Sequence, residues 1–457
     1  MTQATTLPPL QAPPLWKAYL AILAPMMLTN TLQAAAGTID GIYLGQMIGL
    51  EAIAAVSAFF PVFFFLLAII IGLSVGATVL AGQAWGARNP TRARAVAGTA
   101  LALVLAVGLI VSVIGGLTAP MLLKALDTPP EILDDAVRYA RVMLVGAPLI
   151  FLLWLATSIS RGVGDAVSPM WALILATGVA LLCTPALIAG WAGLPRLDVL
   201  SPAVSTLLGF TLALGWLAWR WRRRGHPLAP NAALLRELRF DPALTRSILK
   251  IGVPAALQML TMAAAEIALL GLVNRHGAQA TAAYGAVTQL MSWLQLPAMS
   301  LGISATILAA HAIGAGRGHR LGAIARTGLM MNVAVTGLFV CAAYALAPYA
   351  IGLFLKDGAA AAQAGELLRI VAWSVVALGC ASVLSGVMRA SGTVLVPATL
   401  GVLAIVGVEL PAAWWLDARI GLSGIWWAYA LAFMAMLVLQ SGYFMLGWRR
   451  RTPQRLV

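Results

Sequence analysis

The sequence is short of charge. Only 10% of its 457 residues are Asp, Glu, Lys or Arg, whereas 61% are hydrophobic. A soluble domain carries about 25% charged and about 45–50% apolar residues, so this chain has too few charges to cover the surface of soluble domains. The same composition excludes a disordered chain, a collagen and a coiled coil. The sequence therefore predicts an integral membrane protein.

Motifs of common enzymes and nucleotide-driven pumps are missing as well. There is no Gly-Lys dipeptide, hence no GxxxxGK[ST] phosphate loop, and no HExxH zinc motif. GLSVG at 72–76 fits a nucleophile elbow only formally, because it lies inside an apolar run; small residues there indicate close helix contact. We expect no enzyme activity, no catalytic residue, no metal ligand and no cofactor. If the protein does work against a gradient, the energy would come from an ion gradient or from a partner protein.

Cysteine is scarce, and the N-terminal segment lacks the marks of a signal peptide. The three cysteines, Cys183, Cys341 and Cys380, all fall inside apolar runs. An odd number of thiols in hydrocarbon predicts packing residues and not a disulfide framework. The first residues have no basic region and no cleavage site, so we expect a short cytoplasmic tail in place of a removable signal.

What the chain has in quantity is long apolar runs. A run of about 20 residues is enough for a helix to cross the hydrocarbon core. Twelve such runs predict twelve transmembrane helices, at 17–44, 52–81, 95–122, 137–159, 168–191, 199–221, 247–273, 281–311, 321–352, 366–387, 395–416 and 423–447.

The charges between these runs alternate, and this explains the net charge of +14. One set of segments holds 21 of the 29 Lys and Arg residues: Lys17, 88–94, Arg161, 220–250, 317–326, Arg389 and 449–455. By the positive-inside rule this set is cytoplasmic. Both chain ends are then cytoplasmic, in a bacterial inner membrane. The basic excess thus predicts an orientation, and no nucleic acid is expected as a partner.

The two halves of the chain resemble each other at a constant offset of 228 residues. Matches of Arg and Pro at one offset are informative because both are scarce in membrane spans. Arg161, Gly164 and Pro169 map onto Arg389, Gly392 and Pro397, and His311 stands at the register of Gln83. Six spans is an even number, so the second copy enters the membrane in the same orientation as the first. The copies are then related by a pseudo-two-fold axis along the membrane normal.

These motifs carry a resemblance to a known family. The chain resembles multidrug and toxic compound extrusion (MATE) transporters, of the DinF-like or NorM-like kind, over nearly its whole length. The matching segments are GTIDGIYLG (37–45), GQAWGAR (82–88), RGVGDAVSP (161–169), KIGVPAALQ (250–258) and RASGTVLVP (389–397). The resemblance implies twelve helices in two six-helix lobes, and export of organic, often cationic, compounds driven by protons or sodium ions.

The predicted organisation follows from the spans and the repeat. The fold class is all-α integral membrane, with twelve transmembrane helices in two lobes about the pseudo-two-fold axis. We expect a cytoplasmic tail at 1–16, an N-lobe at 17–221, a cytoplasmic linker at 222–246, a C-lobe at 247–447 and a basic cytoplasmic tail at 448–457.

Asp40 is the leading functional candidate in the N-lobe. An acid inside a span costs roughly 2.5–3.5 kcal/mol or more and usually faces a cavity. Asn30, Gln33, Gly37 and Asp40 follow at spacings of three, four and three, which places them on one helical face. The resemblance puts Asp40 at the position of the family's first-span coupling acid, and puts Gln33 and Tyr139 among residues lining the N-lobe cavity. A structural hydrogen bond to a neighbouring helix is the alternative role.

The fifth span departs from the family pattern. Many relatives carry Asn and Asp there, whereas this chain has Thr184 near the position of that acid. A site with one carboxylate fewer is a poorer oxygen cage for a metal cation, which favours a proton over sodium as the coupling ion. We include Thr184 and Thr206 among the cavity candidates of this lobe.

Two further acids lie within spans of the C-lobe. Glu266 is a candidate for cation binding or coupling, with a structural hydrogen bond as the alternative. Glu409 precedes Pro411, which frees a backbone carbonyl one turn earlier, so local polar repair is its alternative role. Thr288, Ser292 and Gln295 share one helical face and could line a cavity or bond between helices. Gln258 completes the set of cavity candidates.

Together these features predict a secondary active efflux transporter. It would exchange amphipathic, cationic organic compounds for protons, less readily for sodium, by rocker-switch alternating access as a monomer among membrane lipids. The substrate and the stoichiometry stay open. A flippase for a lipid-linked precursor is the alternative; such proteins share the two-lobe organisation but often have a cationic cavity, whereas the three acids here suit a cationic cargo.

Overall fold

The computed structural model describes residues 14–354, 358–450 and 455–456. Most of the predicted tail 1–16 and part of the tail 448–457 therefore lie outside the described residues. Within the described part, ten helical segments are long and apolar enough to cross a membrane, and two bent helix pairs bring the number to twelve. The all-helical prediction and its twelve spans are confirmed.

Eight spans are single helices: α1 (Leu15–Met47), α3 (Phe60–Gly86), α8 (Val167–Ala189), α9 (Ser201–Arg223), α11 (Pro242–Val273), α12 (Ala278–Gly314), α13 (Leu321–Phe354) and α18 (Leu422–Leu446). The fourth span of each half is a bent pair, α6 (Pro130–Val145) with α7 (Ala147–Gly162) and α14 (Gly358–Val371) with α15 (Ser374–Ala390). The bends are 49° and 40°. The same irregularity at the same place in both halves is what an internal repeat predicts.

Two spans contain a π-helical turn. The first is α4 (Pro90–Ile110), η1 (Val111–Gly115) and α5 (Gly116–Ala125). The second is α16 (Leu395–Ala404), η6 (Ile405–Glu409) and α17 (Leu410–Ile420). The short helices α2 (Leu50–Ala58) and α10 (Ala232–Arg236) lie in connections.

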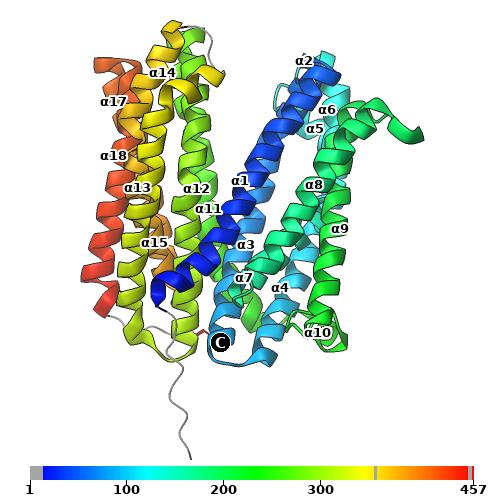
Figure 1. Ribbon diagram of the computed structural model, residues 1–457, viewed down its shortest axis with the longest axis vertical. Coiled ribbons are helices and arrows are strands. Elements are labelled where there is room, and N and C mark those ends of the chain that lie inside the picture. The colour runs from blue at the N-terminus through cyan, green and yellow to red at the C-terminus, as the bar shows by residue number, and fades with distance from the viewer. Residues whose placement is uncertain (1–13, 355–357, 451–454, 457) are drawn as a thin grey trace, which may run out of the picture.

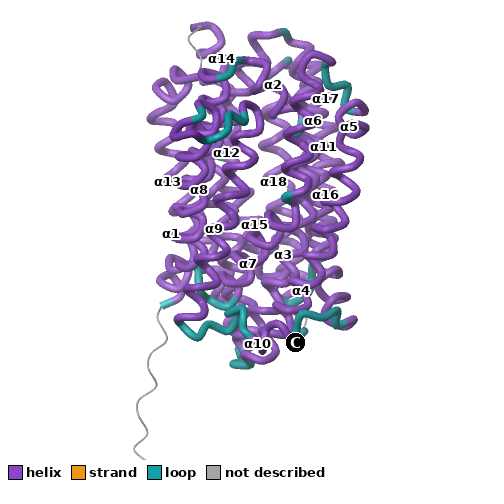
Figure 2. The backbone as a smooth tube through the Cα atoms, turned by 90° about the vertical axis from the view of Figure 1, so that its right-hand side faces the viewer, coloured by secondary structure: helices purple, strands orange, loops and turns teal. Residues whose placement is uncertain are grey.

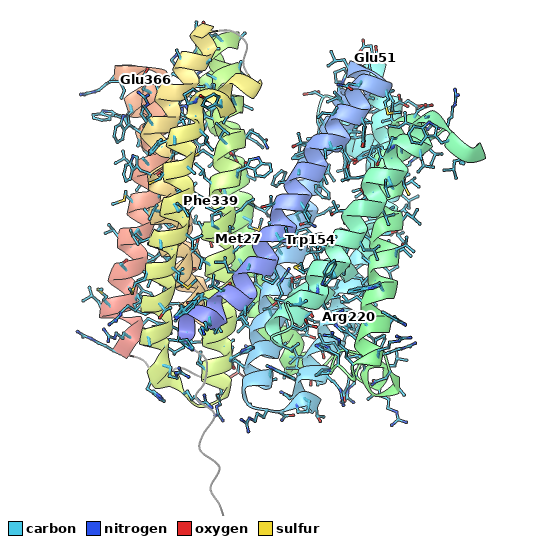
Figure 3. All side chains as sticks on the ribbon, viewed as in Figure 1. Met27, Glu51, Trp154, Arg220, Phe339 and Glu366 are labelled. Carbon is cyan, nitrogen blue, oxygen red and sulfur yellow. The ribbon has the colours of Figure 1, made fainter. Side chains whose placement is uncertain are left out.

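The helices form two bundles that meet at one end and splay apart toward the other (Figure 1). The N-lobe contains α1–α9 and the C-lobe α11–α18. Viewed from the side, the spans run nearly parallel, with α10 and the C-terminus at the same end (Figure 2). Glu51 and Glu366 mark the splayed end and Arg220 lies toward the other (Figure 3). We call these the acidic end and the basic end.

The first helix of each lobe begins in the opposite lobe. Tyr19 and Leu23 of α1 are buried in a core cluster built otherwise from C-lobe residues, and the Tyr19 hydroxyl donates to Ile324 O at 2.9 Å. Conversely, Ile248 and Ile251 of α11 are buried in the N-lobe core. Near the basic end the two lobes are therefore packed through exchanged helices.

Small residues allow α11 to lie directly against α3. A Cβ built on Gly72 would lie 2.5 Å from Gly252 O, and one built on Gly252 would lie 2.7 Å from Gly72 O. Gly76 approaches Ile248 O in the same way. The prediction that the small residues of GLSVG serve close helix contact is confirmed.

Gly72→Ala should lower the thermal stability of the protein. The added methyl group meets backbone atoms, and overpacking of this kind costs about 1–3 kcal/mol. Gly337→Ala is the matched control, because a Cβ there meets nothing within 4 Å and alanine favours the helix. Thermal unfolding in detergent, followed by tryptophan fluorescence, compares the two variants. Equal midpoints for Gly72→Ala and the wild type would contradict this contact.

The linker is held to the basic end by a histidine. His226 stacks on Trp221 with ring centroids 5.2 Å apart, and its Nε2 lies 3.8 Å from Asp165 Oδ2. Burial lowers the pKa of His226 below its ordinary value, and the charge of Asp165 opposes this only in part. The folded protein therefore favours the neutral imidazole.

The stability of the folded protein should fall as the pH is lowered through the range in which His226 titrates. Because the pKa of His226 is lower when folded, the unfolded chain binds more protons near the ordinary value of about 6.5. The stabilisation is fully present above that pH and is lost below it. His226→Phe keeps the stacking and removes the titration, so its unfolding midpoint should change less between pH 7 and 5 than that of the wild type. His319→Phe, at an exposed position, should retain the wild-type dependence.

Candidate functional site

Asp40 lies on α1, half-buried, opposite the fifth span. Its carboxylate faces the hydroxyl of Thr184 on α8, yet Asp40 Oδ1 and Thr184 Oγ1 are both buried without a well-formed hydrogen bond to any described residue. A buried polar atom left in this state costs about 1–3 kcal/mol, and more when charged. A proton, a water or a cation bound here would remove that cost.

Tyr139 completes the group around Asp40. It is 9% exposed and its ring packs edge-on against Phe59, with centroids 5.8 Å apart. The Asp40 charge acts on the Tyr139 hydroxyl, so the two side chains are neighbours. The structure therefore brings Asp40, Thr184 and Tyr139 together from three spans, α1, α8 and α6.

The other N-lobe candidates occupy different positions. Asn30 Nδ2 donates to Ser300 Oγ at 3.3 Å, so it links α1 to α12 between the lobes. Gln33 on α1 and Thr206 on α9 are half-buried, and no described hydrogen bond joins either side chain to Asp40. The polar residues on this face of α1 therefore make different contacts: Asn30 bonds to α12, whereas Asp40 faces α8.

In the C-lobe, five candidates line a single cavity of about 140 Å³. They are Glu266 of α11, Thr288, Ser292 and Gln295 of α12, and Glu409 of η6. Aromatic side chains close the cavity, among them Trp426 and Tyr429. A water occupies about 30 Å³ in the liquid and drug-sized ligands need about 300 Å³ or more, so the space suits an ion with a few waters.

The two glutamates of this cavity differ in exposure. Glu409 is 5% exposed, whereas Glu266 is exposed at the rim. Their negative charges act on each other, and both act on the hydroxyl pair that Tyr284 and Tyr429 form at 2.9 Å. Two carboxylates in one cavity that act on each other favour a shared proton or a bound cation.

Gln258, the remaining C-lobe candidate, lies elsewhere. Its amide packs against Gly401 of α16, and it is not part of the cavity wall around Glu409. Gln258 therefore contributes to the contact between α11 and α16.

Glu409 is positioned by a π-helical turn. The turn covers Ile405–Glu409 and ends one residue before Leu410-Pro411. Proline has no N–H, so the carbonyl of Gly407 lacks its usual partner, and a π-turn is one way for the backbone to adjust. The sequence predicted a freed carbonyl before Pro411; the structure has a π-turn there, and Glu409 at its end lines the cavity. The π-turn itself was not predicted.

A second group of residues, undetected as a site in the sequence, joins the lobes at the basic end. Gln83 Nε2 donates to Ala390 O at 2.7 Å, and His311 Nε2 is bonded to Gly162 O at 2.7 Å. Gln83 and His311 are 228 residues apart, and so are Gly162 and Ala390. The two bonds are therefore equivalent under the repeat. We call this paired contact the seam.

Glycines let the backbones approach at the seam. Gly86 lies against the backbone of His311, and Gly314 lies against the backbone of Gln83. These glycines are again repeat equivalents. The signal was present in the sequence as GQAWG and AHAIG at the same offset, but pattern alone does not state that the two copies touch each other.

Twelve spans in two repeat-related lobes, acids at the level of the spans and a closed seam at one end are the architecture of a multi-pass membrane transporter and not of an enzyme. The MatE family model matches residues 25–185 and 254–415, once in each half. The chain belongs to this family, and the predicted MATE identity is confirmed.

Similarity to two bacterial proteins supports this assignment. The chain is 36% identical over 447 residues to the probable multidrug resistance protein YoeA of Bacillus subtilis, covering 97% of this chain and 96% of that protein. It is 24% identical to the multidrug export protein MepA of Staphylococcus aureus, covering 92% and 91%.

Solved structures share the fold. An outward-facing MATE family transporter matches with a TM-score of 0.87 at 23% identity, covering 95% of this chain and 96% of that one. The Vibrio cholerae MATE transporter VcmN matches with a TM-score of 0.89 at 18% identity, covering 96% and 98%. The two-lobe fold is thus confirmed.

Loss of either seam bond should loosen the basic end. Gln83→Leu and His311→Leu each leave a buried carbonyl without its donor, at a cost of about 1–3 kcal/mol. Amide hydrogen exchange over segments 83–89 and 311–317 should accelerate in both variants. Gln46→Leu, at an exposed position toward the acidic end, is the control. Unchanged exchange in both seam variants would show that the bonds do not hold the lobes.

Proposed function

We propose that this protein exports amphipathic, cationic organic compounds in exchange for protons. The observation that carries the proposal is the incompletely satisfied carboxylate of Asp40 among Thr184 and Tyr139. Such a group gains most from binding a proton, and a moving cation can compete with that proton for the same negative charge. No resident cofactor is needed for this exchange.

The orientation follows from the charges at the two ends. The basic end carries the arginine-rich connections, which the positive-inside rule assigns to the cytoplasm. The seam then closes the cytoplasmic side while the lobes splay on the outer side. Alternating access would consist of breaking the seam and closing the acidic end, with the lobes rocking about the pseudo-two-fold axis.

A proton is favoured over sodium by the N-lobe site. Asp40 supplies the one carboxylate there, and Thr184 and Tyr139 add hydroxyls only. A metal cation bound by proteins prefers more oxygen ligands than this. In the C-lobe, Glu266 and Glu409 offer two carboxylates with Thr288, Ser292 and Gln295, so this cavity is the place where a sodium ion would compete.

A cationic cargo is supported by the sign of the charges within the spans. Asp40 lies among N-lobe helices, Glu266 and Glu409 line a C-lobe cavity, and all three are acidic. At these three acids the diphosphate of a lipid-linked precursor would meet a charge of its own sign, and this disfavours a flippase cargo at these sites. Two relatives are named for multidrug resistance or multidrug export, in keeping with organic compounds as cargo.

Efflux of a cationic dye from everted vesicles tests the proposal. A proton gradient alone should drive transport, and Asp40→Asn should reduce it to the level of vesicles without transporter, because the side chain can no longer release a proton. Glu266→Gln measures the contribution of the C-lobe cavity. Glu51→Gln, an exposed acid on α2, should retain full efflux.

Two results would reject this assignment. Full proton-driven efflux by Asp40→Asn would remove Asp40 from the coupling step. Transport under a sodium gradient but not under a proton gradient would identify sodium as the coupling ion. If Glu266→Gln then lost this sodium-driven transport, the ion would be assigned to the C-lobe cavity.

A further inference from the structure

A second cavity, of about 770 Å³, lies at the basic end where the lobes meet. We call it the seam cavity. Arg88 and Arg94 line it from the N-lobe, and Arg317 and Arg320 line it from the C-lobe, with His311 beside them. No Asp or Glu is among the described residues that line this cavity. Neither the acids within the spans nor the smaller C-lobe cavity belongs to it.

The arginines of this wall are short of partners. Arg94 Nε donates to Pro227 O at 3.2 Å. The side chains of Arg88, Arg317 and Arg320 make no ion pair and no hydrogen bond with any residue that the structure describes. Residues 1–13, which precede Leu15 at the cavity wall, contain no acidic side chain. Four positive charges around one space create a field that attracts an anion and repels a cationic cargo.

The rest of the wall is apolar. Leu15 and Ala18 of α1, Trp85 of α3, and Leu308 and Ile324 complete it. The volume falls in the range of about 300–1,000 Å³ that holds drug-sized molecules, far above the need of a free phosphate ion. The expected ligand therefore has an anionic head and an apolar body.

We propose that the seam cavity binds the phosphate-bearing headgroup of an anionic phospholipid. The planar guanidinium group presents paired donors that match phosphate oxygens. Basic pockets between membrane helices on the cytoplasmic side bind lipid headgroups for this reason. The glycerol and the first acyl carbons then lie along Leu15, Trp85 and Leu308.

Among the described residues, the two repeat-related sides of the seam differ at this cavity. At the equivalent place on the other side, Gly316 stands in the position of Arg88. There the chain fills the space itself: Leu456 N–H donates to Gln83 Oε1 at 2.8 Å and the Arg455 side chain lies against Gly316. We therefore expect one lipid per chain at this end and not a symmetric pair.

A headgroup held from both lobes ties them together at the basic end. Arg88 belongs to the N-lobe and Arg320 to the C-lobe, so a phosphate between them adds to the seam bonds of Gln83 and His311. This consequence rests on the proposed alternating access, whereas the binding itself does not. Under that proposal the lipid favours the state in which the basic end is closed.

Lipid binding to the purified full-length protein in detergent tests the proposal without any transport assay. Phosphatidylglycerol is titrated and the bound lipid counted by native mass spectrometry, beside phosphatidylcholine, inorganic phosphate and glycerol 3-phosphate. We expect one tightly retained phosphatidylglycerol, no equivalent phosphatidylcholine, and only weak effects of the two soluble phosphates on thermal stability.

The arginine variants assign the site. Arg317→Gln with Arg320→Gln should weaken the retained phosphatidylglycerol by about tenfold or more, as expected for lost hydrogen bonds to a charged group. The control pairs Arg92→Gln with Arg224→Gln. Arg92 is the repeat equivalent of Arg320, both residues belong to the basic end, and neither lines the cavity. This variant should bind like the wild type.

Three outcomes would overturn the proposal. Equal losses in the two double variants would mean that the lipid responds to surface charge in general. Equal binding of phosphatidylcholine would remove the role of net charge. Inorganic phosphate that stabilises the protein as strongly as phosphatidylglycerol would identify a free-phosphate site in place of a lipid site. A transporter that fails to couple to protons but retains this lipid would reject the proposed function alone.

Discussion

The arrangement of the whole molecule depends on the contact between the two lobes at the basic end. Each lobe donates one side-chain hydrogen bond to a backbone carbonyl of the other, from Gln83 and from His311. Because the two bonds are repeat equivalents, the contact is self-complementary in the way of a two-fold dimer interface. The bent fourth spans end at the acceptors Gly162 and Ala390, which ties their geometry to the seam as well.

Away from the seam the lobes are no longer alike, and the difference is chemical. Of the three acids inside the predicted spans, the N-lobe holds one, Asp40, whose buried oxygen has no well-formed hydrogen bond among the described residues. The C-lobe holds two carboxylates, Glu266 and Glu409, in a small cavity with hydroxyl and amide groups. A duplicated scaffold thus presents acidic groups of different number and surroundings in its two halves.

Much of the fold could be predicted because its signals are local or periodic. Apolar length defines the spans, and a constant offset of Arg and Pro defines the repeat. The grouping of site residues was harder. Asp40 on α1 faces Thr184 on α8, and Glu266 and Glu409 share one cavity. Gln258 is absent from that cavity because helix rotation is set by the packing of α11 on α16, which pattern does not encode.

Other features were beyond the sequence for a related reason. To predict the seam, one must know that the two copies of one motif touch each other. The π-turn at Ile405–Glu409 depends on how the backbone accommodates Pro411 under packing from its neighbours. The seam cavity depends on arginines from two lobes meeting in space. Each is a relation between segments distant in the chain, and a single sequence read along its length contains no measure of that distance.

The exchange of α1 and α11 between the lobes bears on how such a chain could arise. Tyr19 and Ile248 are buried only because the partner half supplies their surroundings. A lone six-span unit with this packing would expose the start of its first helix and would lack an acceptor across the seam. Such a unit could complete its core only by pairing with a second copy through swapped helices. Joining the copies in one chain makes that pairing independent of concentration and leaves each half free to diverge.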